Sequence, residues 1–281
     1  MSAKAFEIPL ASLAGIHRRL EAAGSGRKCW YVKIYGERNT GSNYFSRLFS
    51  KNYFGTILRG DTPEMWELAE RLTGKLGMAE RISTRTAMHD YEMNRILATD
   101  FGWKHSAPPV EVIMEQAHSL ETLFVILTKH PYSWAESLFR NPYSYEPIAP
   151  NFSEFIRAPF ATSFSDCLPM DVSYNPLTMF RAKVLRYMDL MNTPLAVVHI
   201  RYEDILRSVL DSLAGIDDYF LRQRGEISDI NDDVKGSMRV REDFLRAYSL
   251  AKAGSTLTEE DRAFIVASVG EDVFAFLGYE K

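Results

Sequence analysis

Three short apolar runs, each followed by a turn and then a helical pattern, constrain the fold of this chain most. The runs cover residues 29–35, 122–128 and 195–200 and are rich in β-branched and aromatic residues. Helical spacing follows each of them, at 43–51, 132–139 and 202–213. Short, continuously apolar strands are typical of a parallel sheet covered on both faces. The repeated strand–turn–helix units therefore predict an α/β fold, a three-layer α/β/α sandwich around a central parallel sheet.

Further helical patterns fill the rest of the sequence. Thr256 with Glu259 three residues later has the spacing of a capping box at the start of the last helix. An N-terminal helix is expected within 1–28, because Leu10, Leu13 and Ile16 share one helical face. The stretch 141–175 has weak periodicity and is expected to be a long surface excursion. The remaining predicted helices cover 63–76, 176–191, 239–253 and 258–276.

Length and composition predict one domain over residues 1–281. The net charge of −4 argues against a nucleic-acid partner, so an anion site has to be built locally. Only two cysteines, Cys29 and Cys167, are present, without a CxxC motif, which favours a reduced, cytoplasmic setting. We expect no transmembrane segment, since no apolar run approaches ~20 residues. The histidines show no metal-binding spacing, so we expect no metal site. Oligomeric state is left open.

The first turn, Gly36-Glu37-Arg38-Asn39-Thr40-Gly41-Ser42-Asn43, has the Gly-x4-Gly spacing of a phosphate-binding loop. Glycines let the backbone approach an anion, and the N–H groups that open a helix face its oxygens. Ser42 and Asn43 stand where an ATPase has its lysine and its Mg²⁺-binding hydroxyl. A phosphosulfate fits this loop better, with Arg38 supplying positive charge. The alternative is a turn whose glycines serve only its geometry.

Two other segments carry candidate chemistry. Lys129 ends the second apolar run and Ser137 follows eight residues later, and a cation with a hydroxyl can hold a phosphate. Lys104 and His105 lie in a turn bounded by glycine and proline, where an imidazole with an ordinary pKa near ~6.5 can accept a proton. Taken singly, each segment has a plainer alternative: a solvated strand-end lysine, and a surface histidine.

Together these motifs resemble the sulfotransferases that use 3′-phosphoadenosine 5′-phosphosulfate (PAPS). "GERNTGSNY" is similar to their 5′-phosphosulfate loop, and "KHPYSWAES" to their 3′-phosphate segment. "KH" at 104–105 resembles their lysine–histidine segment, "HIRYEDIL" at 199–206 a common strand–helix element, and "FLGYE" at 276–280 a familiar ending. The loop variant is similar to a bacterial subgroup. The resemblance runs from about residue 29 to the end and implies a P-loop NTPase-like sulfotransferase fold.

The resemblance also implies roles. PAPS would donate a sulfuryl group without a metal, held by Gly36, Arg38 and the segment Asn39, Thr40, Gly41, Ser42 and Asn43, and by Lys129 and Ser137 at its 3′-phosphate. His105 would be the general base, Lys104 would steer the sulfuryl oxygens, and Arg38 would stabilise the charge that builds on the leaving phosphate oxygen. Three departures stand out: Asn39 occupies the position of a catalytic lysine, Lys129 replaces an arginine and lacks its bidentate fork, and Lys104 and His105 lack the usual spacer.

The acceptor is expected to be a small molecule or glycan with a hydroxyl or amine, such as a carbohydrate or glycolipid. The rings of the 141–175 excursion are candidates for its acceptor side, or they pack that stretch onto the core. Two other functions stay open: a nucleotide-binding or regulatory protein without turnover, favoured by Asn39, and another P-loop-class enzyme such as a kinase. The aromatic residues of the 141–175 excursion meant here are Tyr143, Tyr145, Phe152, Phe155, Phe160 and Phe164.

Overall fold

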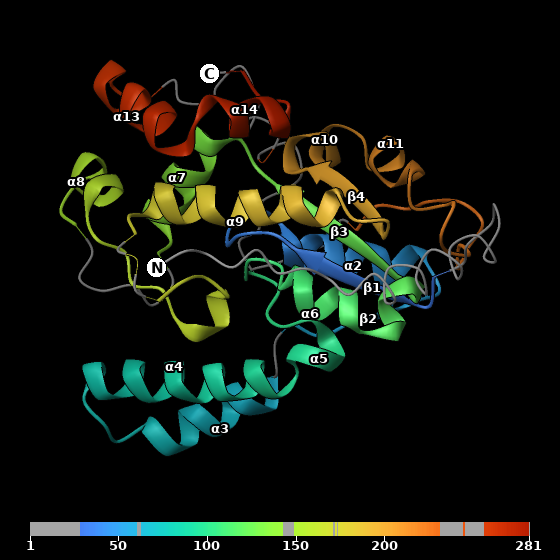
Figure 1. Ribbon diagram of the computed structural model, residues 1–281, viewed down its shortest axis with the longest axis horizontal. Coiled ribbons are helices and arrows are strands. Elements are labelled where there is room, and N and C mark those ends of the chain that lie inside the picture. Colours follow the sequence, from blue (N-terminus) through green and yellow to red (C-terminus); the bar gives the residue numbers. More distant parts are fainter. Residues whose placement is uncertain are drawn as a thin grey trace.

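A computed structural model describes residues 29–60, 63–142, 149–170, 172, 174–230, 244 and 256–280. Its centre is a four-stranded sheet in the order β2-β1-β3-β4, in which every neighbouring pair is parallel. The predicted α/β class with a parallel sheet is therefore confirmed. Figure 1 shows the sheet with helices packed around it. The strands are β1 (Tyr31–Tyr35), β2 (Thr56–Ile57), β3 (Thr122–Thr128) and β4 (Ala196–Arg201).

Helices cover both faces of the sheet, and β3 is therefore buried on both sides. Phe124 and Ile126 point into one hydrophobic cluster, which also contains side chains of α7, α9, α13 and α14. The alternate residues Leu123, Val125 and Leu127 point into a second cluster with α2, α10 and α11. Residues that alternate along a strand face opposite sides of the sheet. These helices are α2 (Ser42–Asn52), α7 (Pro131–Arg140), α9 (Pro176–Met191), α10 (Tyr202–Arg207), α11 (Val209–Ala214), α13 (Glu259–Val269) and α14 (Glu271–Leu277).

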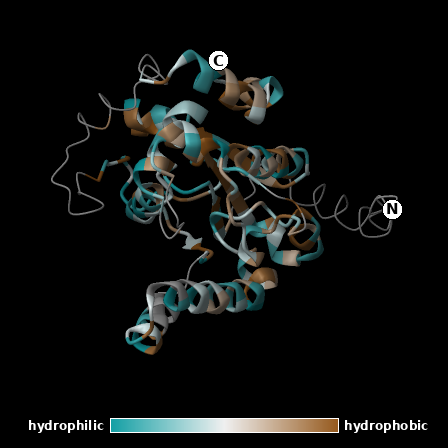
Figure 2. Ribbon diagram, turned by 90° about the vertical axis from the view of Figure 1, so that its left-hand side faces the viewer, coloured by the Kyte–Doolittle hydropathy of each residue, from teal (hydrophilic) through white to brown (hydrophobic). Residues whose placement is uncertain are grey.

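The other helices lie beside this sandwich. Figure 1 shows α3 and α4 side by side, apart from the sheet, and Figure 2 shows hydrophobic residues concentrated in the sheet region while this hairpin is largely hydrophilic. The side chain of His89 in α4 contacts Ser165, with Nδ1 and Oγ 3.1 Å apart, which ties the hairpin to η2. These elements are α3 (Pro63–Thr73), α4 (Met78–Arg95), α5 (Leu97–Asp100), α6 (Val110–Glu115), η1 (Ala117–Glu121), α8 (Phe152–Arg157) and η2 (Phe164–Asp166).

Most predicted elements recur, with corrections at their ends. β3 and α9 have the predicted bounds, whereas β1 begins at Tyr31 and β4 runs from Ala196 to Arg201. The predicted helix 202–213 is two helices, because the side chain of Ser208 caps the second by accepting from Asp211 N. The predicted helix 258–276 is broken at Gly270, whose φ is 89°. The helix predicted over 63–76 ends at Thr73.

Two further predictions about the C-terminal part and the excursion also change. The capping residue of α13 is Thr258, which accepts from Asp261 N, so the predicted Thr256–Glu259 box is wrong; the Thr256 hydroxyl instead donates to Glu136. The 141–175 stretch is not only surface, since Phe155 and Phe160 are buried in the core. The helices predicted within 1–28 and 239–253 lie outside the described residues, apart from residue 244.

No helix among the described residues combines the length and the apolar character that crossing a membrane requires.

Candidate functional site

The loop between β1 and α2 forms the floor of the candidate site. Gly36 fits there because it is enclosed: a Cβ on it would lie 2.7 Å from Leu127 O and 2.7 Å from Thr40 Oγ1. Gly41 has a left-handed φ of 85°, and a Cβ there would lie 2.6 Å from the Tyr202 ring. Close packing therefore requires a glycine at both positions, and the backbone path also requires one at Gly41.

The start of α2 offers backbone N–H groups to an anion. Gly41 occupies the N-cap position, and no side chain of the described residues caps the helix there. The first N–H groups of a helix have no intrahelical acceptor, and they carry the positive end of the helix dipole. Ser42 and Asn43 thus present donors as expected. The Thr40 amide differs, because it donates to Glu37 O at 3.2 Å, and the Thr40 hydroxyl donates to the same oxygen at 2.7 Å.

Lys104 and His105 lie against this loop, held there by β1. The buried Lys33 ammonium donates to Gly102 O at 2.5 Å, and the Tyr35 hydroxyl donates to Phe101 O at 2.6 Å. Gly36 N then donates to Lys104 O at 3.0 Å. Three bonds from β1 and the residue after it thus fix the position of the 101–105 segment.

The two predicted side chains of that segment reach the loop directly. Lys104 Nζ donates to Asn43 Oδ1 at 2.9 Å. His105 Nδ1 lies 2.6 Å from Gly36 O. Since a carbonyl oxygen only accepts, the imidazole proton resides on Nδ1, and Nε2 is the unprotonated nitrogen of the neutral ring. The sequence predicted that this pair lies near the phosphate loop, and the structure brings them together.

The environment keeps the His105 imidazole neutral. Burial lowers the pKa of His105 well below its usual 6.5. The neighbouring charges of Arg38 and Lys104 lower that pKa further, against the opposite effect of the bond to Gly36 O. His105 is thus not an ordinary surface histidine: at neutral pH its imidazole is uncharged, and Nε2 is the unprotonated nitrogen.

Arg38 is held in place on several sides. Its guanidinium stacks on the Trp103 ring at 4.6 Å, and its NH1 lies 3.8 Å from Glu37 Oε1. Its carbonyl accepts from Trp134 Nε1 at 3.0 Å. The Trp103 ring also contacts the imidazole of His105, with centroids 5.0 Å apart. The same indole therefore contacts both the proposed charge-stabilising arginine and the proposed base.

Asn39 takes a different direction. Its φ is 67°, in the left-handed region that asparagine tolerates, and its side-chain amide donates to Asn141 O at 3.4 Å. The amide therefore links the loop to the end of α7.

Lys129 and Ser137 form a second, buried polar group. Lys129 Nζ donates to Ser137 Oγ at 2.9 Å, and Ser137 Oγ donates to Ser133 O at 2.7 Å. The ammonium also lies 5.1 Å from the centre of the Tyr202 ring, the ring that Gly41 contacts. Tyr202 therefore lies between the loop and the Lys129–Ser137 pair, and the lysine is 2% exposed, not solvated at a strand end.

His130, next to Lys129, has a structural role. Its Nδ1 accepts from Tyr132 N at 3.3 Å, which caps α7. Its Nε2 donates to Glu280 O at 3.1 Å, which fastens the end of the described chain.

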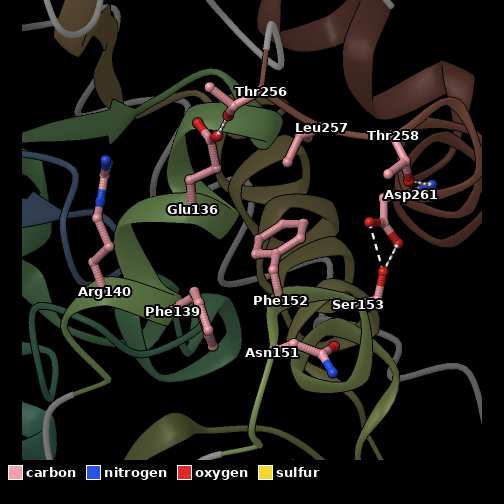
Figure 3. Close-up of a pocket in the computed structure, with 10 residues that line it drawn as sticks. All are labelled: Glu136, Phe139, Arg140, Asn151, Phe152, Ser153, Thr256, Leu257, Thr258 and Asp261. Atoms are coloured by element: carbon pink, nitrogen blue, oxygen red, sulfur yellow. Dashed lines mark hydrogen bonds between the residues drawn. The ribbon is translucent and has the colours of Figure 1, made fainter.

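A pocket of about 460 Å³ lies elsewhere, between α7, α8 and the start of α13 (Figure 3). Phe139, Phe152 and Asp261 are among its lining residues, and none of the predicted site residues lines it. Arg140 is the link, since it lines the pocket and its NH2 lies 3.5 Å from Ser137 Oγ. Among the aromatic residues of the excursion, Phe152 lines this pocket, Phe155 and Phe160 are buried in the core, and Phe164 is exposed; Tyr143 and Tyr145 lie outside the described residues.

Sequence reasoning missed the buried charges behind the site. Lys183 on α9 is fully buried between Glu37 and Asp166, with an Nζ–carboxylate distance of 2.6 Å to each. A signal was present: Lys183 shares a helical face with Met179, Phe180 and Tyr187, all buried. A lysine on the apolar face of a helix requires buried partners. In the described part of the chain, no cluster of three or more His, Cys, Asp or Glu side chains is arranged to hold a metal.

Comparison of the chain with models of known protein families and with curated proteins gave no match.

Proposed function

We propose that this protein is a PAPS-dependent sulfotransferase with a P-loop NTPase-like sulfotransferase fold. The observation that carries the proposal is the bond between His105 Nδ1 and Gly36 O. It places a neutral imidazole, with its Nε2 lone pair available, against a loop that is shaped for an anion. A base beside an anion cradle is the requirement for moving a charged group onto a hydroxyl or amine.

The donor would be held at two places. The N–H groups that open α2 at Ser42 and Asn43 would bind the 5′-phosphosulfate, with Arg38 and Lys104 adding positive charge. Lys129 and Ser137 would bind the 3′-phosphate, exchanging their mutual bond for bonds to its oxygens. An ammonium acts there as a point charge, without the bidentate geometry of arginine.

The transfer would be a direct displacement. A new sulfur–oxygen or sulfur–nitrogen bond forms to the acceptor while the sulfur–oxygen bond to the 5′-phosphate breaks. The electron pair of the broken bond stays on the phosphate oxygen, and the acceptor proton goes to His105 Nε2. Arg38 and Lys104 would stabilise the charge that builds on the leaving oxygen, which is usually the largest contribution to catalysis.

The acceptor class is a hydroxyl or amine on a small molecule or glycan, with a carbohydrate or glycolipid as the candidate. The support for this acceptor class is chemical. A neutral imidazole can remove the proton of a hydroxyl or amine as its oxygen or nitrogen bonds to sulfur, because that proton becomes more acidic as the bond forms.

The first test is ligand binding by thermal shift. Adenosine 3′,5′-bisphosphate at ~100 times its Kd is expected to stabilise the protein by ~2.7 kcal/mol, and ATP with Mg²⁺ by much less. A larger shift with ATP and Mg²⁺ would instead favour a kinase-like enzyme.

The second test is turnover of His105→Ala. We expect PAPS-dependent transfer to fall ~10²–10⁴-fold while bisphosphate binding persists. His118→Gln, a change at a half-buried histidine whose Nε2 contacts Thr99 O and not the loop, serves as the matched control. Wild-type protein that binds the bisphosphate but transfers nothing across a broad acceptor panel would favour a regulatory protein.

A further inference from the structure

Lys183 is a buried cation that the proposed chemistry does not use. It lies on α9, and its side chain is fully buried. Its ammonium donates to Glu37 Oε2 at 2.6 Å, to Asp166 Oδ1 at 2.6 Å and to His105 O at 2.7 Å. An ammonium has three N–H donors. All three are therefore directed at acceptors, and the orientation of the group is fully determined.

The three acceptors belong to three different segments. Glu37 is in the anion loop, His105 carries the proposed base, and Asp166 belongs to η2. The other carboxylate oxygen of Glu37 accepts from Arg38 N at 2.7 Å and lies 3.8 Å from Arg38 NH1. Lys183 thus bonds directly to the His105 carbonyl and connects to Arg38 through the carboxylate of Glu37.

The Trp103 ring, which lies near the lysine, also contacts both Arg38 and His105. Lys183 Nζ lies 5.9 Å from the centre of the Trp103 ring, the ring on which Arg38 stacks and against which His105 packs. Trp103 is buried. Movement of the ammonium would therefore displace the loop, the indole and the backbone of the base together.

Stability alone does not explain such a group. Buried ionic networks replaced by apolar or neutral side chains of similar volume are often as stable as the original. Burial alone would raise the pKa of Asp166, but the charges of Lys183 and Arg38 outweigh it and hold that pKa lowered, so the carboxylate stays ionised. The network is one of charges, and its members converge on the segments that carry the site.

We propose that Lys183 is a positioning residue: from behind the site it fixes the His105 imidazole and the Arg38 guanidinium relative to each other, without touching substrate. The inference rests on the proposed function for its catalytic consequence. The positioning itself is a property of the free protein and can be measured without any substrate.

The test compares two variants in which an ion-pair network is replaced by uncharged side chains. Lys183→Met combined with Glu37→Gln and Asp166→Asn removes the network with side chains of similar volume and leaves neither carboxylate buried without its lysine, while the Arg38 guanidinium keeps its stacking on Trp103. The control, Arg157→Met with Asp261→Asn, removes the ion pair between α8 and α13, whose atoms are 2.6 Å apart. Circular dichroism and urea unfolding establish that both variants are folded.

Two measurements are made on the folded proteins. The first is the kcat for PAPS-dependent transfer beside the Kd of adenosine 3′,5′-bisphosphate. We expect the triple variant to lose ~10–100-fold in kcat, as a misplacement of about 1 Å produces, and to show a smaller fold-change in Kd; the control keeps both. The second is ¹⁵N NMR of the His105 imidazole, in which the Nδ1-protonated form dominates the wild type and is lost or mixed in the triple variant.

A folded triple variant with wild-type kcat and an unchanged imidazole spectrum overturns the inference. If the wild type shows no transfer, the proposed function fails, and the imidazole spectrum alone then decides whether Lys183 positions His105. If the triple variant does not fold, Glu37→Gln alone carries both measurements with a smaller expected loss, and an unchanged spectrum there counts against the inference.

Discussion

Lowering the pH from 7.5 to 5 should destabilise this protein through His130, well before most of its carboxylates are protonated. His130 is 5% exposed, and burial lowers its pKa to about 4, against a raising effect of the Glu280 carbonyl. Protonation requires Nδ1, which caps α7 by accepting from Tyr132 N. The added charge would also face the positive end of the helix dipole. The folded protein therefore resists a proton that the unfolded chain accepts.

The magnitude follows from the two pKa values. Between the unfolded value near ~6.5 and the folded value of about 4, the unfolded chain binds more protons, so stability falls as the pH drops. Integrating from pH 7.5 to pH 5 gives a loss of ~2 kcal/mol in the free energy of unfolding. His199, whose pKa burial also lowers to about 4, adds a second contribution of the same sign. Such losses are a large part of a typical stability of ~5–15 kcal/mol.

Urea unfolding at pH 7.5, 6 and 5 measures the effect, with His130→Asn as the comparison. Asparagine still accepts a capping hydrogen bond but does not titrate. The variant should lose about 2 kcal/mol less than the wild type between pH 7.5 and 5, and adding His199→Gln should reduce the loss again. If His130→Asn and the wild type lose the same free energy over this range, the assigned role of the buried imidazole is wrong.

Three other predictions concern the loop, a helix start and the donor site. Gly41→Ala should lower the free energy of unfolding by ~1–3 kcal/mol in urea titrations, because φ is 85° and the new Cβ would meet the Tyr202 ring at 2.6 Å; an unchanged midpoint would contradict the packing. Ser208→Ala should cost about 1 kcal/mol by removing the cap of α11, measured in the same way, and a loss under ~0.3 kcal/mol would refute it. Lys129→Met should weaken the binding of adenosine 3′,5′-bisphosphate by ~10-fold or more in calorimetry and change the binding of 5′-AMP little. Equal weakening of both ligands would show that Lys129 does not bind the 3′-phosphate.

The parts of the fold that the sequence predicted well depend on local patterns. β3 has its predicted bounds because a continuous apolar run ends at Lys129, before a proline that starts α7. α9 has its predicted bounds because Asn175 caps it, Pro176 occupies the first turn and Asn192 ends it. In both cases the signals that begin and end the element are adjacent to it in sequence.

What the sequence did not predict depends on long-range partners. β2 has two residues, and its existence depends on pairing with β1. The break of α10 from α11 depends on a serine side chain that turns back to the backbone. The proximity of Lys104 and His105 to the loop was expected, but the tautomer of His105 follows from the Gly36 carbonyl alone, and that contact spans 69 residues.

The charge arrangement around the loop would allow an acidic chain to form the proposed anion site, although Asn39 stands where the sulfotransferase loop that it resembles has a lysine. Arg38 and Lys104 lie at the loop, and Lys183 lies behind them between the carboxylates of Glu37 and Asp166. These three cations therefore outnumber the two carboxylates. Lys104 reaches Asn43 from a segment that β1 holds in place, so positive charge missing within the loop enters from outside it. The carboxylate of Glu37 is directed at Lys183 and the Arg38 backbone. Because the positive charge is distributed between two segments that move independently in an unfolded chain, the proposed site would exist only in the folded protein, and its affinity for an anion would depend on the contacts that hold those segments together.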